Sequence, residues 1–385
     1  MLLKSRFIEM FGCIGKDEKQ WGLKSLKDCV EVNPQKSKDP LILSNSIEEV
    51  SFVPMAFVGE NGSIDCSCIK NYDEVKSGFT YFKENDVLFA KITPCMENGK
   101  GCIAKGLHNG IGFGSTEFHV LRPLDNLCNP KWLYYVSTSQ EMRRSAEKKM
   151  TGSAGQRRVP AKFLEDFKIS IPPIELQKQF ATFVSQVDKS KFLLQQMIAK
   201  LELLKKSRFI EMFKNSQKVN LKDVSEITMG QSPDSITYNT EKDGLPFFQG
   251  KTEFKEKYIG TPSVWCNAPK KIANSNDILM SVRAPVGDVN ITLEKCCIGR
   301  GLASIRAKNI STEYLFFALS LLKDEIESKG VGSTFKAINK DIIESIQIPS
   351  VDKKLQNDFS EFFIQIDKSK AILQKQLDDL VGSNK

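Results

Sequence analysis

The chain has 385 residues, of which 41% are hydrophobic and 26% are charged. These proportions are typical of a soluble globular protein, and the length leaves room for two or three domains. No apolar run reaches the roughly 18–20 residues that span a bilayer, and the N-terminus does not resemble a secretion signal, so we expect a cytoplasmic protein with no membrane partner. The formal net charge of +8 is compatible with a polyanionic partner but does not require one.

The residue types that most often carry chemistry are few or scattered. The ten cysteines show no regular spacing, and in a cytoplasmic protein we expect them to be reduced thiols. Only two histidines occur, His108 and His119. Any histidine-based catalysis or metal binding would therefore have to use one of these two side chains.

The first predicted element, residues 1–14, contains a heptapeptide that recurs later in the chain. The sequence Ser-Arg-Phe-Ile-Glu-Met-Phe occupies residues 5–11 and, unchanged, residues 207–213. Five further matches follow in the same order, which indicates an internal duplication with pseudo-twofold character. These matches are Leu26-Lys27-Asp28 with Leu221-Lys222-Asp223, Asn85-Asp86 with Asn276-Asp277, Gly152-Ser153 with Gly332-Ser333, Ile171-Pro172 with Ile348-Pro349, and Val187-Asp188-Lys189-Ser190-Lys191 with Ile366-Asp367-Lys368-Ser369-Lys370.

Residues 15–172 predict the first globular block, with mixed α/β (α+β) structure. Runs rich in β-branched and aromatic residues at 52–58 and 87–92 predict strands, and residues 130–150 predict a helix. A polar loop with two glycines and two arginines then follows. Backbone amides, small polar side chains and cations of this kind suit phosphate oxygens, although a solvated connection would look similar. The candidate DNA-binding residues of this loop are Ser153, Gln156, Arg157 and Arg158.

Residues 173–215 predict a long central helix. From residue 174 to 213 it would extend roughly 60 Å at 1.5 Å per residue, which is too long to serve one small domain. Apolar residues recur in steps of three and four, the spacing of a coiled-coil seam. The predicted seam is Leu176, Phe180, Phe183, Val187, Ser190, Leu194, Met197, Leu201 and Leu204.

Residues 216–350 predict the second globular block. Residues 278–282 predict a strand and residues 312–329 a helix, as at the matching places of the first block. A second polar, glycine-bearing loop with lysines follows this helix. Its candidate DNA-binding residues are Ser333, Thr334, Lys336 and Asn339.

Residues 351–385 predict a second long helix, antiparallel to the first. It lacks the heptapeptide ending of the central helix, so we expect residues 1–14 to pack beside it and complete the second repeat in space. A serine at the same seam position of both helices suggests a close helix crossing there. The predicted seam is Leu355, Phe359, Phe362, Ile366, Ser369, Leu373, Gln376 and Leu380.

The second block resembles the target-recognition domains of type I restriction-modification specificity subunits. The similar segments are residues 230–233 (Gly-Gln-Ser-Pro), 238–239, 244–250 (Gly-Leu-Pro-Phe-Phe-Gln-Gly) and the closing stretch 332–349. The resemblance extends over nearly the whole chain, but residues 33–35 (Asn-Pro-Gln) stand roughly where 230–233 stand and no counterpart of 244–250 follows them. The resemblance implies further DNA-binding residues in the second block, namely Gln231, Tyr238, Asn239, Gln249, Lys251 and Arg283.

The resemblance also implies a function and its partners. Two tandem target-recognition domains, separated by two antiparallel coiled-coil helices that act as a spacer, would each read half of a bipartite site in double-stranded DNA. Two methyltransferase subunits would bind this frame, and restriction/translocase subunits would join them. S-adenosylmethionine, ATP and Mg²⁺ would serve those partners, so we expect a non-enzymatic chain that binds no cofactor and no metal.

Two other functions remain as alternatives. A coiled-coil assembly scaffold without DNA specificity would explain the helices but not the recurring basic loops. A single-chain nuclease would rest on Pro233-Asp234 and Glu253-Phe254-Lys255, a short pattern without a counterpart in the first block. An adenine methyltransferase is not expected, because the one Pro-Pro pair, at 172–173, lies between isoleucines instead of following Asn or Asp.

Overall fold

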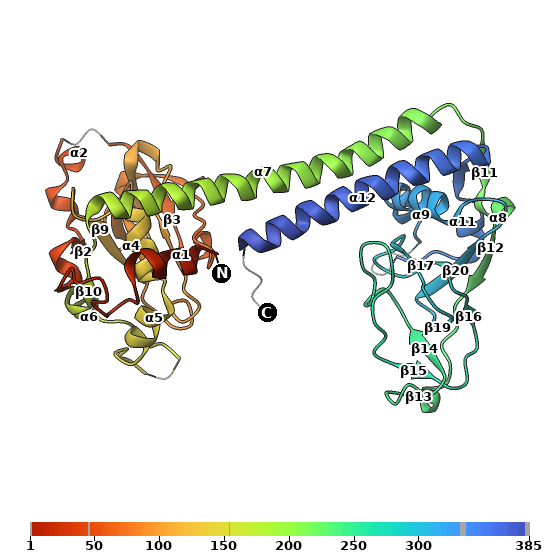
Figure 1. The fold of residues 1–385 in the computed structure, drawn as a ribbon, viewed down its shortest axis with the longest axis horizontal. Coiled ribbons are helices and arrows are strands. Elements are labelled where there is room, and N and C mark those ends of the chain that lie inside the picture. Colours follow the sequence, from red (N-terminus) through yellow and green to blue (C-terminus); the bar gives the residue numbers. More distant parts are fainter. Residues whose placement is uncertain (1, 45–46, 154, 332–335, 382–385) are drawn as a thin grey trace. The chain divides into compact units, whose positions relative to one another are not determined.

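The computed structural model describes residues 2–44, 47–153, 155–331 and 336–381, which form two compact units. Unit 1 comprises Met1–Leu193 and Leu377–Lys385, and unit 2 comprises Leu194–Gln376. The two long helices, α7 (Ile174–Phe213) and α12 (Lys353–Val381), are each divided between the units (Figure 1). The sequence divided the chain into globular blocks and separate helices, whereas each compact unit contains a block together with parts of both helices.

Unit 1 contains two four-stranded sheets. The first is antiparallel, and the second contains one parallel pair, β3 with β8. The first sheet has the order β2 (Val30–Val32), β9 (Phe118–Pro123), β6 (Val87–Ala90) and β7 (Gly101–Ile103); the second has the order β4 (Ile69–Asn71), β3 (Glu49–Val53), β8 (Ile111–Gly114) and β5 (Thr80–Lys83). The remaining elements are α1 (Leu2–Phe11), α2 (Pro40–Leu43), α3 (Tyr72–Val75), α4 (Pro130–Ser137), α5 (Gln140–Glu147), α6 (Ala161–Asp166) and the pair β1 (Leu23–Ser25) with β10 (Lys168–Ser170).

Unit 2 repeats this plan. Its antiparallel sheet has the order β12 (Ser225–Met229), β20 (Leu302–Ala307), β17 (Ile278–Ser281) and β18 (Val289–Ile291); its other sheet has the order β13 (Tyr238–Asn239), β15 (Trp265–Cys266), β14 (Leu245–Phe248), β19 (Cys296–Ile298) and β16 (Ile272–Ala273), with β14 and β19 parallel. The remaining elements are α8 (Leu221–Val224), α9 (Thr312–Leu321), α10 (Lys323–Ser328), α11 (Lys340–Glu344) and the pair β11 (Lys218–Asn220) with β21 (Gln347–Pro349). Mixed α/β structure and the internal repeat are confirmed.

Most predicted elements form, with shifted boundaries. The strand expected over 52–58 ends at Val53, where Pro54 introduces a turn at Met55–Phe57. The two long helices expected inside the blocks are each broken into two, α4 with α5 and α9 with α10. The helix predicted from 174 to 213 has these bounds in the structure.

Buried ion pairs show that the repeat extends to single side chains. In unit 1 the Arg122 guanidinium donates two hydrogen bonds to the Asp86 carboxylate, at 2.9 and 2.7 Å. In unit 2 Arg306 does the same to Asp277, at 2.9 and 3.1 Å. Both aspartates are almost fully buried, so the bidentate partner compensates for the loss of hydration. The Asn-Asp pair found in the sequence is therefore part of the structural core of each block.

The repeated heptapeptide supplies two phenylalanines to an aromatic cluster in each unit. In unit 1, Phe7 and Phe11 of α1 contact Phe180 of α7, with ring centroids 5.4 Å apart in both cases. In unit 2, Phe209 and Phe213 of α7 contact Phe359 of α12 at 5.3 and 5.4 Å. Residues 2–11 are helical as predicted. Their phenylalanines contact Phe180 of α7 as Phe209 and Phe213 contact Phe359 of α12, so α1 occupies in unit 1 the place that the end of α7 has in unit 2. The packing of α1 beside the C-terminal helix stays a prediction.

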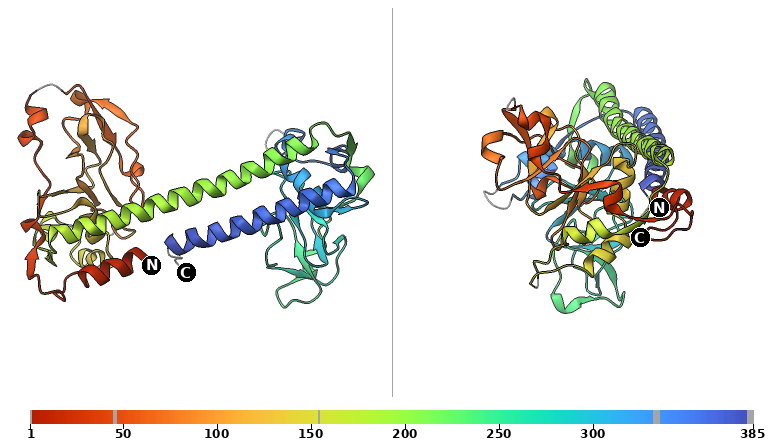
Figure 2. Two further views of the ribbon diagram at one scale, coloured as in Figure 1. Left: turned by 45° about the horizontal axis from the view of Figure 1, so that its top comes forward. Right: turned by 90° about the vertical axis from the view of Figure 1, so that its left-hand side faces the viewer.

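Within unit 2 the helices α7 and α12 run antiparallel. Glu202 pairs with Lys370, Lys205 with Asp367, and Phe209 packs on Phe359, so partner numbers fall as residue numbers rise along α7. Figure 2 shows the two helices side by side along this stretch. The predicted antiparallel arrangement is confirmed.

Alternate positions of the predicted seam were wrong by one residue. Along α12 the buried side chains are Gln356, Phe359, Phe363, Ile366 and Leu377, so every second position shifts from the predicted 355, 362 and 376. Along α7 they include Gln177, Phe180, Val184 and Val187. Ser190 and Ser369 are exposed, so the proposed close crossing at these serines was wrong. An apolar pattern misses a seam that contains glutamine.

The buried glutamines have a structural reason. In unit 1 the Gln177 amide donates to the carbonyls of Pro172 and Leu127, and its oxygen accepts from the backbone N–H of Asn129. In unit 2 Gln356 donates to the carbonyl of Val351 and accepts from Ser311 N–H. Each glutamine thus joins a long helix to the residue that begins α4 or α9, and its polar atoms are satisfied.

Candidate nucleic-acid interface

The basic loop of unit 1 is a short hairpin-like segment with paired arginines. Thr151 and Arg158 form a backbone bridge, and Arg158 also bridges to Ile92. The Arg158 side chain makes a bidentate contact with Glu117, at 2.7 Å for the Nη2–Oε1 pair. Arg157 lies 3.3 Å from Glu97. The hydrogen bonds from Arg158 hold the pKa of Glu117 below its usual value. Both predicted cations are therefore partly neutralised within the chain.

Ser153 and Gln156 of the same loop are exposed, and their backbones are joined by a hydrogen bond from Gln156 N–H to the Ser153 carbonyl at 3.1 Å. Neither side chain has a fixed role inside the protein that would prevent contact with a ligand. They remain candidate ligands for phosphate, close to Arg157.

The corresponding loop of unit 2 has a different charge pattern. Val331 bridges to Ala337, which also bridges to Arg283, so Lys336 and Arg283 lie on neighbouring segments. Both side chains are exposed, and neither forms an ion pair with a residue of the described ranges. The predicted residues Ser333 and Thr334 lie outside the described residues.

Four of the predicted residues of unit 2 lie on backbone segments that are joined to one another by hydrogen bonds. A fifth residue, Arg300, was not predicted and lies on one of these segments. Gln231 N–H donates to Ile298, Gly301 N–H to Gln249, and Val282 N–H to Gly301. Arg300 lies between these contacts and is exposed. We call this set the recognition edge; it consists of Gln231, Gln249, Arg283, Arg300 and Lys336.

The remaining predicted residues of unit 2 have structural partners. The Asn239 side chain is bonded to the backbone of Asp243 in a turn, and Asn339 caps α11 by accepting from Ile342 N–H. Lys251 lies 2.5 Å from Asp288, a carboxylate that Lys323 contacts as well. Desolvation alone would raise the pKa of Asp288, but the two lysines outweigh it and lower the pKa.

Tyr238 is partly buried and stacks on Phe247, with the ring centroids 4.7 Å apart. Its hydroxyl donates to the Pro233 carbonyl at 3.0 Å. Burial raises the pKa of Tyr238, and the positive charge of Arg300 opposes that rise.

The two units differ at equivalent positions of the two interfaces. Lys91 N–H donates to the Glu117 carbonyl in unit 1, as Val282 N–H does to Gly301 in unit 2, so Glu117 and Gly301 are equivalent. Their neighbours Thr116 and Arg300 are then equivalent too, as are the bridge residues Arg158 and Ala337. The Arg158–Glu117 ion pair of unit 1 is replaced in unit 2 by two small residues and an unpaired arginine nearby.

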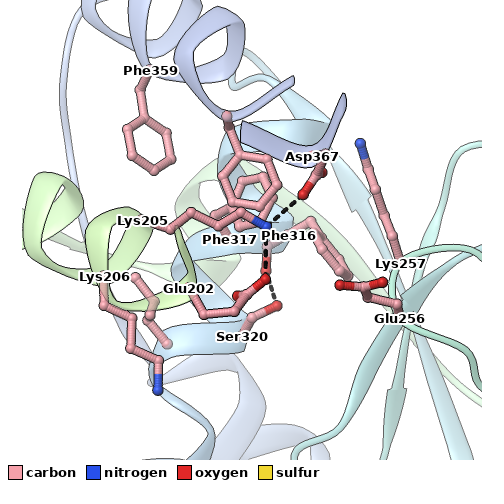
Figure 3. Close-up of a pocket in the computed structure, with 12 residues that line it drawn as sticks. Glu202, Lys205, Lys206, Glu256, Lys257, Phe316, Phe317, Ser320, Phe359 and Asp367 are labelled. Carbon is pink, nitrogen blue, oxygen red and sulfur yellow. Dashed lines mark hydrogen bonds and ion pairs between the residues drawn. The ribbon is translucent and has the colours of Figure 1, made fainter. Parts of the chain in front are cut away.

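A cavity of about 160 Å³ lies in unit 2 where α7, α9 and α12 meet. Phe316, Phe317 and Phe359 line its apolar side (Figure 3). On its charged side the buried Lys205 donates to Asp367 at 2.5 Å and to Glu202 at 3.2 Å. The Lys205 ammonium also lies 4.1 Å from the Phe363 ring centroid. This cluster ties the helix pair to the globular part of unit 2.

Among residues 2–44, 47–153, 155–331 and 336–381, no group of three or more His, Cys, Asp or Glu side chains is placed to hold a metal ion. No helix in these same ranges has the length and apolar character needed to cross a bilayer.

Comparison with known proteins identifies the family. A model described as the type I restriction modification DNA specificity domain matches residues 18–203 and 214–381. The chain belongs to this family. The specificity subunit is also 30% identical over 406 residues to the type I restriction enzyme MjaX specificity subunit of Methanocaldococcus jannaschii, across 97% of this chain and 92% of that protein.

Solved structures agree with this assignment. A chain solved in work on the complex assembly and conformational transition of the type I R-M system has a TM-score of 0.68 and 28% identity, with 93% of each chain covered. The HsdS subunit from Thermoanaerobacter tengcongensis has a TM-score of 0.54 and 27% identity, again with 93% of each chain covered. The predicted family, fold class and role as a DNA-recognition subunit of a type I complex are confirmed for this specificity subunit.

Proposed function

We propose that each unit of the specificity subunit reads one half of a bipartite site in double-stranded DNA. The observation that carries this proposal is that two blocks whose antiparallel sheets have the same strand order have different side chains at equivalent positions. Two half-sites of different sequence require different side chains on a shared backbone fold. Gln, Arg and Lys side chains in these surfaces are the types that read base edges and hold phosphates.

The subunit itself carries out no reaction in this proposal. Two methyltransferase subunits bind the α7 and α12 helices, and restriction/translocase subunits join the complex. Exposed apolar side chains on these helices support such a contact, because water-facing apolar side chains along a helix mark interaction surfaces. They include Phe192, Leu203, Ile210 and Ile372. S-adenosylmethionine, ATP and Mg²⁺ are used by the partners and not by this chain.

The test exchanges one unit. Residues 194–376, the bounds of unit 2, are replaced by the matching segment of a relative, and the DNA sites methylated by the assembled complex are mapped. We expect one half of the recognised sequence to change and the other to stay. A change in both halves, or methylation without sequence preference, would overturn the two-reader proposal and favour the scaffold alternative.

A further inference from the structure

Three backbone segments of the recognition edge lie side by side with almost no side chain between them. Gly299 N–H donates to the Phe248 carbonyl at 2.8 Å, Gly301 N–H to Gln249 at 3.1 Å, and Gly230 N–H to Leu302 at 2.9 Å. A Cβ atom at Gly301 would strike the Gln249 carbonyl oxygen, and one at Gly230 would strike the Gly299 carbonyl oxygen. The close approach therefore requires glycine at these two positions.

Three exposed side chains belong to these glycine-containing segments. Gln231, Gln249 and Arg300 are all exposed, and each belongs to a different one of the three segments. The backbone N–H of Arg300 is held by the Ser232 hydroxyl at 3.2 Å, which fixes the start of its side chain. The Arg300 guanidinium forms no ion pair or side-chain hydrogen bond with the part of the chain that the structure describes. Its donors are available to a ligand.

The chemistry of these three groups matches the edges of bases. A guanidinium donates two parallel hydrogen bonds to O6 and N7 of guanine, and a glutamine amide pairs with N6 and N7 of adenine. Gly299 and Gly301 carry no side chain on either side of Arg300, which leaves room for a base edge next to it. Arg283 and Lys336 begin on the neighbouring segments and suit phosphate oxygens.

We propose that Arg300 is a specificity-determining residue that reads a guanine in the half-site bound by unit 2. This inference rests on the proposed function. The equivalent residue of unit 1 is Thr116, which has no guanidinium, so the half-site bound by unit 1 is read without this contact. The difference between Arg300 and Thr116 then accounts for a difference in base sequence between the two half-sites.

The experiment uses the full chain assembled with its methyltransferase subunits and a library of duplexes with randomised sequence. Wild type, Arg300→Ala and Arg300→Lys are compared by sequencing the bound duplexes. Arg300→Ala is expected to lower the preference for one guanine, in one half-site, by about tenfold or more, and to leave the other half-site unchanged. Arg300→Lys keeps the charge and is expected to keep part of this preference. Arg144→Ala removes an exposed arginine from α5 of unit 1 and is the matched control, with no expected change at that guanine.

The outcomes separate the inference from the function on which it rests. If the wild-type complex selects no sequence, both are overturned. If wild type selects a bipartite site and both Arg300 variants keep every base preference, Arg300 is not a reader and the two-unit function stands. If Arg300→Ala weakens binding to all sequences equally and reduces the salt dependence by about one phosphate contact, Arg300 holds the DNA backbone and the inference is wrong.

Discussion

The guanidinium of Arg158 lies 2.7 Å from the carboxylate of Glu117, and the equivalent residues of unit 2 are Ala337 and Gly301. One unit thus presents its basic loop with an internal anionic partner, whereas Arg283 and Lys336 of the other unit form no ion pair within the described residues. An internal carboxylate competes with phosphate for the same donors. The two units should therefore contribute unequally to the electrostatic part of DNA affinity.

Replacing Glu117 with glutamine should strengthen binding of the subunit to nonspecific duplex DNA. The neutral side chain no longer holds the Arg158 cation, so that cation is free to displace a counterion from a phosphate. The slope of log K against log salt should become steeper by about one unit. Binding is measured by titration of a labelled duplex at several salt concentrations. Glu165→Gln, which removes an acidic side chain of α6 in the same unit, is the control; an equal effect of both variants would show only a general charge effect.

Removing Lys336 should weaken specific and nonspecific DNA binding alike. Lys336→Ala and Arg283→Ala should each reduce the magnitude of the salt slope by about one unit, the amount expected for one lost phosphate contact. Arg157→Ala should have a smaller effect, because Glu97 already neutralises part of that charge. Lys340→Ala removes a lysine that is paired with Glu344 and serves as the control. A constant slope with a changed sequence preference would make Lys336 a base-reading residue.

Truncating the first phenylalanine of either heptapeptide copy should lower the free energy of unfolding by a similar amount. Phe7→Ala and Phe209→Ala each remove a buried ring from equivalent aromatic clusters, and a loss of about 3–5 kcal/mol is typical of such sites. Unfolding in denaturant, monitored by hydrogen exchange, would show in which unit each loss of stability occurs. Ile8→Ala and Ile210→Ala remove exposed neighbours and should cost far less. A negligible loss for Phe7→Ala would mean that α1 does not contribute to the core of unit 1.

The aliphatic part of the buried Lys205 side chain should contribute more to the free energy of unfolding than its charge does. Lys205→Ala leaves Asp367 without its partner and removes packing on Phe363, for an expected loss of about 1–3 kcal/mol. Lys205→Met keeps the packing and should cost less. The free energy of unfolding in urea checks both variants, with the exposed Lys206→Ala as control. An equal loss for the two variants would show that the ion pair, which both of them remove, dominates over the packing.

The buried His119 should make the fold less stable in mild acid. Its Nε2–H donates to the Val159 carbonyl at 2.7 Å and its Nδ1 accepts from the Asn33 amide at 3.0 Å, so both nitrogens are satisfied in the neutral form. Burial is the main cause of a pKa lowered below 6.5. As the pH falls through about 6.5, the unfolded state gains a proton that the folded state resists, and stability decreases.

Unfolding of wild type and His119→Gln at pH 7.5 and 5.5 tests this relationship. The glutamine variant should lose less stability between the two pH values than wild type does. His108→Gln changes the partly buried histidine beside Glu49 and should keep the wild-type loss. If the His119 and His108 variants behave alike, groups other than His119 control the acid sensitivity.

The sequence predicted the repeat, the long helices and the family, because identical short segments and a regular apolar spacing are visible without coordinates. It misplaced half of the helix seam, because Gln177 and Gln356 are buried for their hydrogen bonds and not for their hydrophobicity. The duplicated heptapeptide showed that α1 and the end of α7 are equivalent, but the phenylalanine that each of them contacts, Phe180 or Phe359, was not predicted.

Part of the candidate interface also follows from the sequence. Gln231, Gln249, Arg283 and Lys336 were predicted to bind DNA and lie on adjoining segments, and their contact with DNA stays a prediction. Arg300 was missed, although the glycines on both sides of it signal a close backbone approach. The neutralising partners Glu97 and Glu117 were missed as well, because they lie 60 and 41 residues before the arginines that they contact. No local motif could have revealed those pairs.

The division of α7 between the two units has a consequence for how such proteins exchange specificities. Phe209 and Phe213 belong to the central helix, yet they pack against Tyr314 and Phe359 of unit 2. Genetic recombination at the end of the helix, near residue 215, would join these rings to a foreign core, whereas a junction near residue 193 would transfer them with their own partners. The middle of the helix is thus the point at which two parent genes can be joined with each core inherited whole.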